Sequence, residues 1–230
     1  MSSIEISRSD DLINMGRYAK LVCIFTELAM FSQLANTMYM VYAGTPPTIT
    51  EIYGCGVSNF TNKEEACALI SSCKHPEIVF SRQFHGISEQ FKLYCDEHVE
   101  KIGTSLQMMG IMLGCLVFGH LSDVYGRKKP MIVCLIMCAL LGYLSSFSKN
   151  FAVFTVLRTL LSVFNGGQST ISVVYMMENI PKRHRMCLST LISFSPNVIL
   201  LGIVAYIFQD WRSLSNVISI MLIPPIFLTL

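Results

Sequence analysis

Residues 119–130 read Gly-His-Leu-Ser-Asp-Val-Tyr-Gly-Arg-Lys-Lys-Pro, and this stretch decides the fold. It lies between two apolar runs, at about 102–118 and 131–147. Gly119 and Gly126 allow the backbone to pack closely and to turn sharply. The stretch therefore predicts a tight, basic turn between two membrane-length helices.

The charges of this turn indicate how it is used. Asp123 lies near a helix end, where it can meet Arg127 or a neighbouring helix terminus. Arg127, Lys128 and Lys129 supply the positive charge that keeps a short loop on the cytoplasmic side of a membrane.

The composition excludes an ordinary soluble domain. Hydrophobic residues make up 52% of the chain and charged residues only 14%, against roughly 25% charged residues in soluble domains. A net charge of +2 gives no electrostatic case for nucleic acid as a partner. The apolar residues form blocks long enough to cross a bilayer, which takes about 20 residues. We therefore expect an all-α, polytopic membrane protein whose partner is the lipid bilayer.

The blocks divide the chain into four parts. Residues 1–20 form a polar tail, and 21–43 form a first transmembrane helix that also serves as the uncleaved insertion signal. Residues 44–100 form a long loop, and 101–230 hold helices two to six. These five helices are expected at about 102–120, 131–148, 151–176, 188–208 and 213–230.

Basic residues alternate from one connecting segment to the next. They gather in the tail, after the second helix and after the fourth: Arg8, Arg17 and Lys20; Arg127, Lys128 and Lys129; Lys182, Arg183 and Arg185. The short segments between carry only Lys149 and Arg212. This bias predicts a cytoplasmic N-terminus, and we expect the plasma membrane as the location.

That orientation places the 44–100 loop outside the cell, and two features of the loop agree. Asn59 begins the only N-x-[S/T] glycosylation sequon of the chain. Four cysteines also lie there: Cys55, Cys67, Cys73 and Cys95. An even set outside the cell predicts two disulfides, with three possible pairings. The nearby histidines match no zinc spacing, so we expect no metal site.

The stretch 119–130 follows the pattern G-x-L-[S/A]-D-x-x-G-R-[K/R] and resembles the cytoplasmic loop of major facilitator superfamily transporters. Three further stretches resemble the organic cation/anion transporter family: Phe91-Lys92-Leu93-Tyr94-Cys95-Asp96, the start of the loop at Tyr42–Pro47, and Asp210–Leu214. The resemblance covers most of the chain. It implies the N-terminal six-helix half of a secondary transporter, with a large external loop after the first helix.

The fourth helix carries a second resemblance. From Arg158 through Gly166-Gly167 to Glu178, with Arg185 seven residues further, the sequence resembles the fourth-helix signature of sugar porters and organic ion transporters. Ser162 stands where that signature has glycine, a departure that a small residue tolerates. A sugar porter half therefore remains the runner-up.

The resemblance implies a gating motif made of Gly119, Asp123, Gly126, Arg127, Arg158, Glu178 and Arg185. In similar transporters the charges at the cytoplasmic helix ends form ion pairs that hold the inner gate shut. The alternative is a set of exposed loop charges, each of which contributes little to stability. Arg158 differs from these because it lies inside an apolar run, where it needs a partner or a watery cavity.

The first helix offers a candidate wall for a substrate cavity. Thr26, Gln33 and Thr37 fall on one narrow stripe at helical spacing. Hydrogen bonding between helices, without solute contact, explains the stripe equally well. Glu27 points away from it by a quarter-turn or more.

We expect alternating access for a small organic cation or anion, with no covalent chemistry, no enzyme activity and no cofactor, because no nucleotide-binding or hydrolase motif occurs. A transporter of this superfamily has two six-helix halves, and this chain has one. It is then a truncated transporter, a half that forms a homodimer if the chain is complete, or a non-transporting protein that regulates or assembles with transporters.

Overall fold

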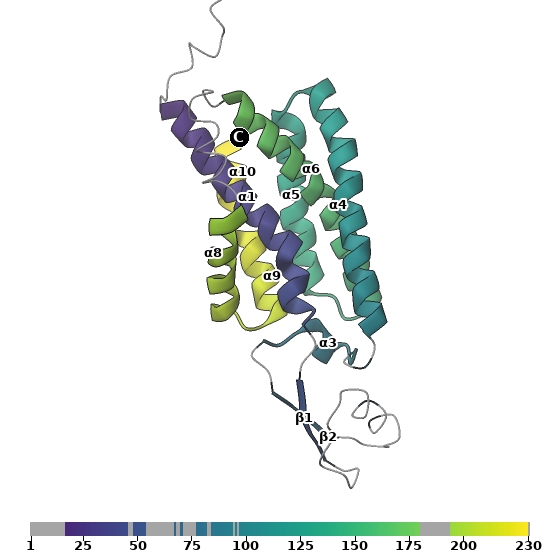
Figure 1. Ribbon diagram of the computed structural model, residues 1–230. Coiled ribbons are helices and arrows are strands. Elements are labelled where there is room, and N and C mark those ends of the chain that lie inside the picture. The colour runs from purple at the N-terminus through teal and green to yellow at the C-terminus, as the bar shows by residue number, and fades with distance from the viewer. Residues whose placement is uncertain are drawn as a thin grey trace, which may run out of the picture.

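The computed structural model describes residues 17–45, 48–53, 67, 70, 77–81, 84–93, 95, 97–179 and 194–229. The helices of the bundle are α1 (Arg17–Ala43), α4 (Glu97–Tyr125), α5 (Lys128–Ser146), α6 (Phe151–Asn179), α8 (Phe194–Ile207), α9 (Trp211–Ile220) and α10 (Ile223–Thr229). They form one bundle (Figure 1). We call the end with the α4–α5 turn the turn end. The opposite end, where α1 finishes and α4 begins, is the loop end.

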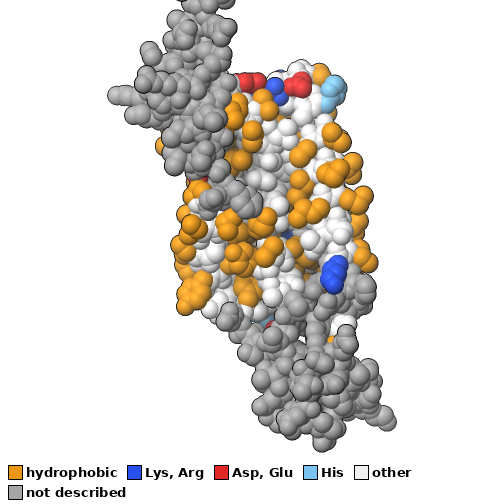
Figure 2. Space-filling model, in the orientation of Figure 1, with side chains coloured by type: hydrophobic (Ala, Val, Ile, Leu, Met, Phe, Trp, Pro, Cys, Tyr) orange, Lys and Arg blue, Asp and Glu red, His pale blue; other side chains and the backbone are white. Residues whose placement is uncertain are grey.

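The surface of the bundle fits a bilayer. Large apolar side chains such as Met112, Leu116 and Tyr206 are 68%, 70% and 78% exposed. Hydrophobic side chains spread over the visible face, and acidic and basic ones gather mainly at the turn end (Figure 2). Four described spans are long and apolar enough to cross a membrane: Leu21–Ala43, Lys101–Tyr125, Lys128–Ser146 and Trp211–Thr229. The expected all-α polytopic fold is confirmed.

Helix α6 was predicted as a span from its length, yet it is not among those apolar spans. Its polar side chains explain this, because Arg158, Asn165 and Gln168 are all buried inside the bundle. The helix packs against α1, α4 and α5, so its surroundings, rather than its own hydropathy, keep these polar groups from lipid.

Helices α4 and α6 approach each other closely at small residues. A Cβ added at Gly114 would overlap the backbone carbonyl of Val163, and one added at Gly166 would overlap that of Ile111. Small residues allow this kind of backbone contact between membrane helices. The spacing between α4 and α6 is therefore set by direct backbone contact at these glycines.

The two glycines of the α4–α5 turn differ from each other. Gly126 has φ +84°, in the left-handed region, and nothing would contact a Cβ there. Its role is the sharp turn, as expected. Gly119 was expected to allow close backbone packing, but a Cβ there would meet only Thr170 Cγ2 at 3.7 Å, an ordinary contact.

The sixth membrane segment, predicted as one helix over 213–230, is two helices, α9 and α10, broken at Met221–Leu222. Pro224 and Pro225 lie in the first turn of α10. Proline lacks an N–H and its ring clashes with the carbonyl four residues earlier, so neither residue can continue α9. The ends of the other helices lie within a few residues of the prediction, except that α8 is described only from Phe194.

The long loop contains structure that the sequence did not predict. Strands β1 (Thr48–Tyr53) and β2 (Glu77–Ser81) pair antiparallel, with Thr48 opposite Ser81. The short helix α3 (Ile87–Gln90) lies between this hairpin and the loop end of the bundle (Figure 1).

The loop is fastened to the start of α9. The backbone N–H of His85 donates to Gln209 O at 2.7 Å, and that of Trp211 donates to His85 O at 3.2 Å. The indole Nε1 of Trp211 donates to Gln90 Oε1 at 2.7 Å. Ring contacts of Phe91 with Trp211 and Phe154 complete the contact.

Candidate functional site

The charged residues of the α4–α5 turn meet the end of α6. Arg127 Nη1 lies 2.7 Å from Asp123 Oδ1, and Arg127 Nη2 lies 3.2 Å from Glu178 Oε1. Nη1 also donates to Ser122 Oγ at 2.8 Å. One guanidinium thus joins a carboxylate of its own turn to a carboxylate that lies 51 residues further along the chain.

This arrangement can be broken at low cost. The side chains of Asp123 and Glu178 are 63% and 50% exposed, and an exposed ion pair contributes about 0.2–1 kcal/mol. Two such pairs hold the α4–α5 turn next to the end of α6, but they are weak enough to break. An energy of this size suits a contact that forms and breaks between two conformations.

Arg158, grouped with the gating motif from the sequence, lies apart from these ion pairs. It is 20 residues before Glu178 on α6, which is about 30 Å along a helix, and it is 3% exposed. Its Nη1 donates to Asn36 Oδ1 on α1 at 3.4 Å, and its Nη2 donates to Ser215 Oγ on α9 at 3.0 Å. It is therefore a separate site in the half of the bundle near the loop end.

The guanidinium of Arg158 is enclosed by neutral groups. Its Cζ lies 3.5 Å from the centroid of the Tyr39 ring and 5.6 Å from that of Phe154, and a desolvated cation over an aromatic face gains about 2 kcal/mol. No acidic side chain forms an ion pair with Arg158 within the part of the chain that the structure describes. The charge joins α1, α6 and α9 by hydrogen bonds and ring contacts.

The three residues of the expected cavity wall are not equivalent. Thr26 is fully buried, and its hydroxyl donates to Val22 O within its own helix at 2.7 Å. Gln33 and Thr37 are half-buried and hydrogen-bond to each other at 3.3 Å. Of the three, only Gln33 and Thr37 are therefore less than fully buried.

Three buried amides that the sequence analysis did not single out join the helices. Gln107 of α4 donates to Asn36 O at 3.0 Å, and Gln168 of α6 donates to Ala29 O at 2.9 Å. Asn165 of α6 donates to Gln33 O at 3.2 Å and to Thr37 Oγ1 at 3.0 Å. Amides in otherwise apolar helices are the signal that could have identified them, because such groups need partners in a membrane.

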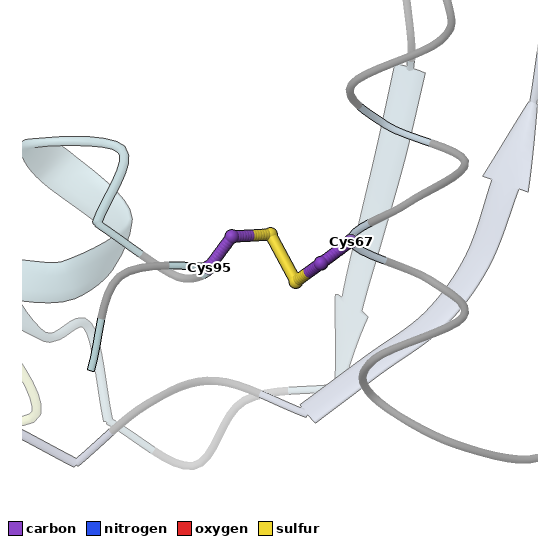
Figure 3. The surroundings of a disulfide bond; sticks show 2 residues. All are labelled: Cys67 and Cys95. Atoms are coloured by element: carbon purple, nitrogen blue, oxygen red, sulfur yellow. A yellow bond between two sulfur atoms is a disulfide. The ribbon is translucent and has the colours of Figure 1, made fainter. Parts of the chain in front are cut away.

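A disulfide joins Cys67 to Cys95, two of the four loop cysteines (Figure 3). Cys55 and Cys73 lie outside the described residues, as do the predicted glycosylation site Asn59 and the last residue of the expected gating motif, Arg185. No group of three or more potential metal ligands occurs in the described residues.

These features define a polytopic membrane protein with polar and charged side chains inside a helix bundle and ion pairs at one of its ends. The chain matches the profile of the family described as "Sugar (and other) transporter" over residues 21–228. It belongs to that family of membrane transporters, which are not enzymes.

Individual relatives agree with the family. The chain is 27% identical to solute carrier family 22 member 7 of Rattus norvegicus, over 84% of this chain and 36% of the relative. It is 30% identical to organic cation/carnitine transporter 4 of Arabidopsis thaliana, over 89% of this chain and 38% of the relative. It is 32% identical to solute carrier family 22 member 6 of Pseudopleuronectes americanus, over 58% of this chain and 24% of the relative. The chain thus spans 24–38% of the length of these relatives.

Proposed function

We propose that this protein takes part in moving small organic ions across a membrane by alternating access, with this chain forming one six-helix half of the pathway. The name of the Arabidopsis relative, organic cation/carnitine transporter 4, supports an organic ion as the solute. The observation that carries the mechanism is the bridge of Arg127 between Asp123 and Glu178.

In this mechanism the bridge belongs to a gate at the turn end. When it is formed, the α4–α5 turn and the end of α6 stay together and the pathway is closed at this end. When it breaks, the two ends separate. The gate requires a second half to close against, supplied by further chain or by a second copy of this one. Purified protein that is monomeric and binds no second half would contradict this arrangement.

The gate is tested by a pair of matched variants. Arg127→Ala removes both ion pairs, whereas Lys129→Ala removes the same charge from the same turn, and Lys129 forms no ion pair with a described residue. We expect Arg127→Ala to reduce the uptake rate of tetraethylammonium or benzenesulfonate several-fold, with an unchanged amount of protein at the cell surface. A parallel fall in surface protein, or an equal effect of both variants, would show that the bridge serves folding instead.

The orientation belongs to the same proposal. We place the N-terminus in the cytoplasm, the 44–100 loop outside the cell and the protein in the plasma membrane, as the distribution of basic residues supports. Glycan removal by an N-glycosidase should increase the electrophoretic mobility of the wild type and leave Asn59→Gln unchanged. A wild type without a glycan would count against an external loop.

Transport of an uncharged sugar is the second candidate, favoured by the description of the family itself. Competition decides between the two. Excess glucose should leave the uptake of a charged probe unchanged, and inhibition would favour the sugar. A non-transporting regulator is the third candidate, and it predicts no saturable uptake of either class of solute.

A further inference from the structure

One face of α1 carries three half-buried polar side chains, although the helix spans the membrane. These are Glu27, Gln33 and Thr37, with the half-buried Cys23 and Met30 between them. At 100° per residue these positions fall within about a third of the helix circumference. A further exposed set, Leu21 and Ile24 at 53% and 54% exposure, lies on a different side and is wholly apolar.

The two sides have different surroundings in a membrane. The apolar side suits lipid. The polar side does not, because an acidic side chain facing hydrocarbon costs roughly 3 kcal/mol or more. The stripe from Cys23 to Thr37 therefore faces water or protein, as the wall of a solute pathway does.

Glu27 is the charged member of this half-buried stripe. It lies about 80° around the helix from Thr37 and about 120° from Gln33, and its carboxylate is incompletely paired. Its side chain hydrogen-bonds to that of Asn197 on α8, while its Oε2 is buried and has no hydrogen-bond partner. No basic side chain within the described part of the chain forms an ion pair with it. A buried acceptor without a donor or cation is costly, so the position favours occupation by a positive group.

The neighbours of Glu27 suit a cation with an apolar coat. Cys23 and Met30, its neighbours on the same face, pack against Met176 of α6, as Met177 also does. Thioethers are soft and adapt to irregular apolar shapes. A quaternary or alkylated ammonium ion combines a positive charge with such a shape.

The opposite charge in the membrane is not available to a solute. Arg158 is 3% exposed and is enclosed by Tyr39, Phe154, Asn36 and Ser215. Thus the negative charge of Glu27 belongs to the half-buried stripe, whereas the positive charge of Arg158 is sealed inside the bundle.

We propose that Glu27 is a specificity-determining residue that binds the positive group of an organic cation, so that the pathway selects cations over anions. The inference rests on the proposed transport function, and it adds a binding site that can be measured without transport.

Two permanently charged probes test it in the protein expressed from its native transcript. Uptake of radiolabelled tetraethylammonium should exceed that of benzenesulfonate. Glu27→Gln should lower tetraethylammonium uptake about tenfold or more, the loss expected when one member of a desolvated charge pair is removed, and Glu27→Asp should restore part of it. Glu89→Gln, the same chemical change on α3 outside the bundle, is the matched control.

A binding measurement separates this inference from the transport proposal. Cys23 lies one helical turn from Glu27, so tetraethylammonium at Glu27 should slow maleimide labelling of Cys23 in purified protein, measured on the peptide by mass spectrometry. Protection in the wild type that is lost in Glu27→Gln supports the site, even where neither probe is transported and the transport proposal fails. Tetraethylammonium uptake that is measurable in the wild type and unchanged in Glu27→Gln, protection independent of Glu27, or a Cys23 that no maleimide reaches would each overturn it.

Discussion

The contact of α4 with α6 allows a graded prediction at three glycines of the same helix. A Cβ at Gly119 would meet Thr170 Cγ2 at 3.7 Å, which is ordinary van der Waals contact. A Cβ at Gly110 would lie 2.8 Å from Thr159 O. A Cβ at Gly114 would lie 2.7 Å from the Val163 carbonyl carbon and closer still to its oxygen. Only the first position has room for a methyl group.

The expected magnitudes follow from this order. Gly119→Ala adds a methyl group without a clash and should be neutral or slightly stabilising, because alanine favours helix more than glycine. Gly110→Ala should cost about 1 kcal/mol, and Gly114→Ala about 3 kcal/mol, because backbone atoms cannot rotate away and overpacking costs about 1–3 kcal/mol. The three variants carry the same chemical change on one helix, so each is a control for the others.

The assay is the midpoint of thermal aggregation in detergent, measured by fluorescence-detected size-exclusion chromatography. The midpoint should fall in the order Gly119→Ala, Gly110→Ala, Gly114→Ala. Widening the α4–α6 spacing should also separate Arg127 from Glu178, so Gly114→Ala should weaken any functional effect of Glu178→Gln. A Gly114→Ala protein as stable as Gly119→Ala would refute the close contact.

Three further changes test other parts of the structure. Trp211→Phe removes the bond to Gln90 Oε1 and should cost about 1 kcal/mol, visible as faster amide hydrogen exchange over residues 84–93. Cys67→Ser removes the disulfide to Cys95, which closes a loop of 28 residues and contributes about 4 kcal/mol to stability in the chain-entropy description. The variant's loop should become sensitive to protease, and an unchanged sensitivity would argue against the pairing. Arg158→Lys keeps the charge but loses the planar guanidinium that reaches two side-chain acceptors. The variant should lose about 1–3 kcal/mol of stability, visible as a lower thermal midpoint. An unchanged midpoint would show that charge alone matters.

Features with a local cause could be predicted from the sequence. The left-handed turn at Gly126 and the apolar spans depend on residues within a few positions of each other. The pairing of Asp123 with Arg127 is likewise an i, i+4 contact on successive turns. Here the helical period alone brings the groups together.

Features that depend on tertiary contacts could not be predicted from the sequence. The separation of Arg158 from the ion pairs at the turn end could not be predicted, because the motif gives order along the chain, whereas α6 separates Arg158 from Glu178 by its length. Thr26 shared a stripe with Gln33, yet only the packing of neighbouring helices decides which of them is buried. The break at Met221–Leu222 had a visible local cause, Pro224–Pro225, which the apolar pattern concealed.

The two kinds of contact on α6 have different consequences for movement. Its contact with α4 depends on backbone atoms at glycines, which allows a single spacing. Its contacts with α1 include amide donors, Asn165 and Gln168, that reach backbone carbonyls. Hydrogen bonds between membrane helices contribute only about 0.6 kcal/mol on average, and every turn of α1 presents another carbonyl to an amide that shifts. If this half changes shape during the proposed transport, the α1–α6 contact is where the free-energy cost is lowest. Gln33 and Thr37, which lie at that contact, would then move relative to Arg158 while α4 and α6 stay together.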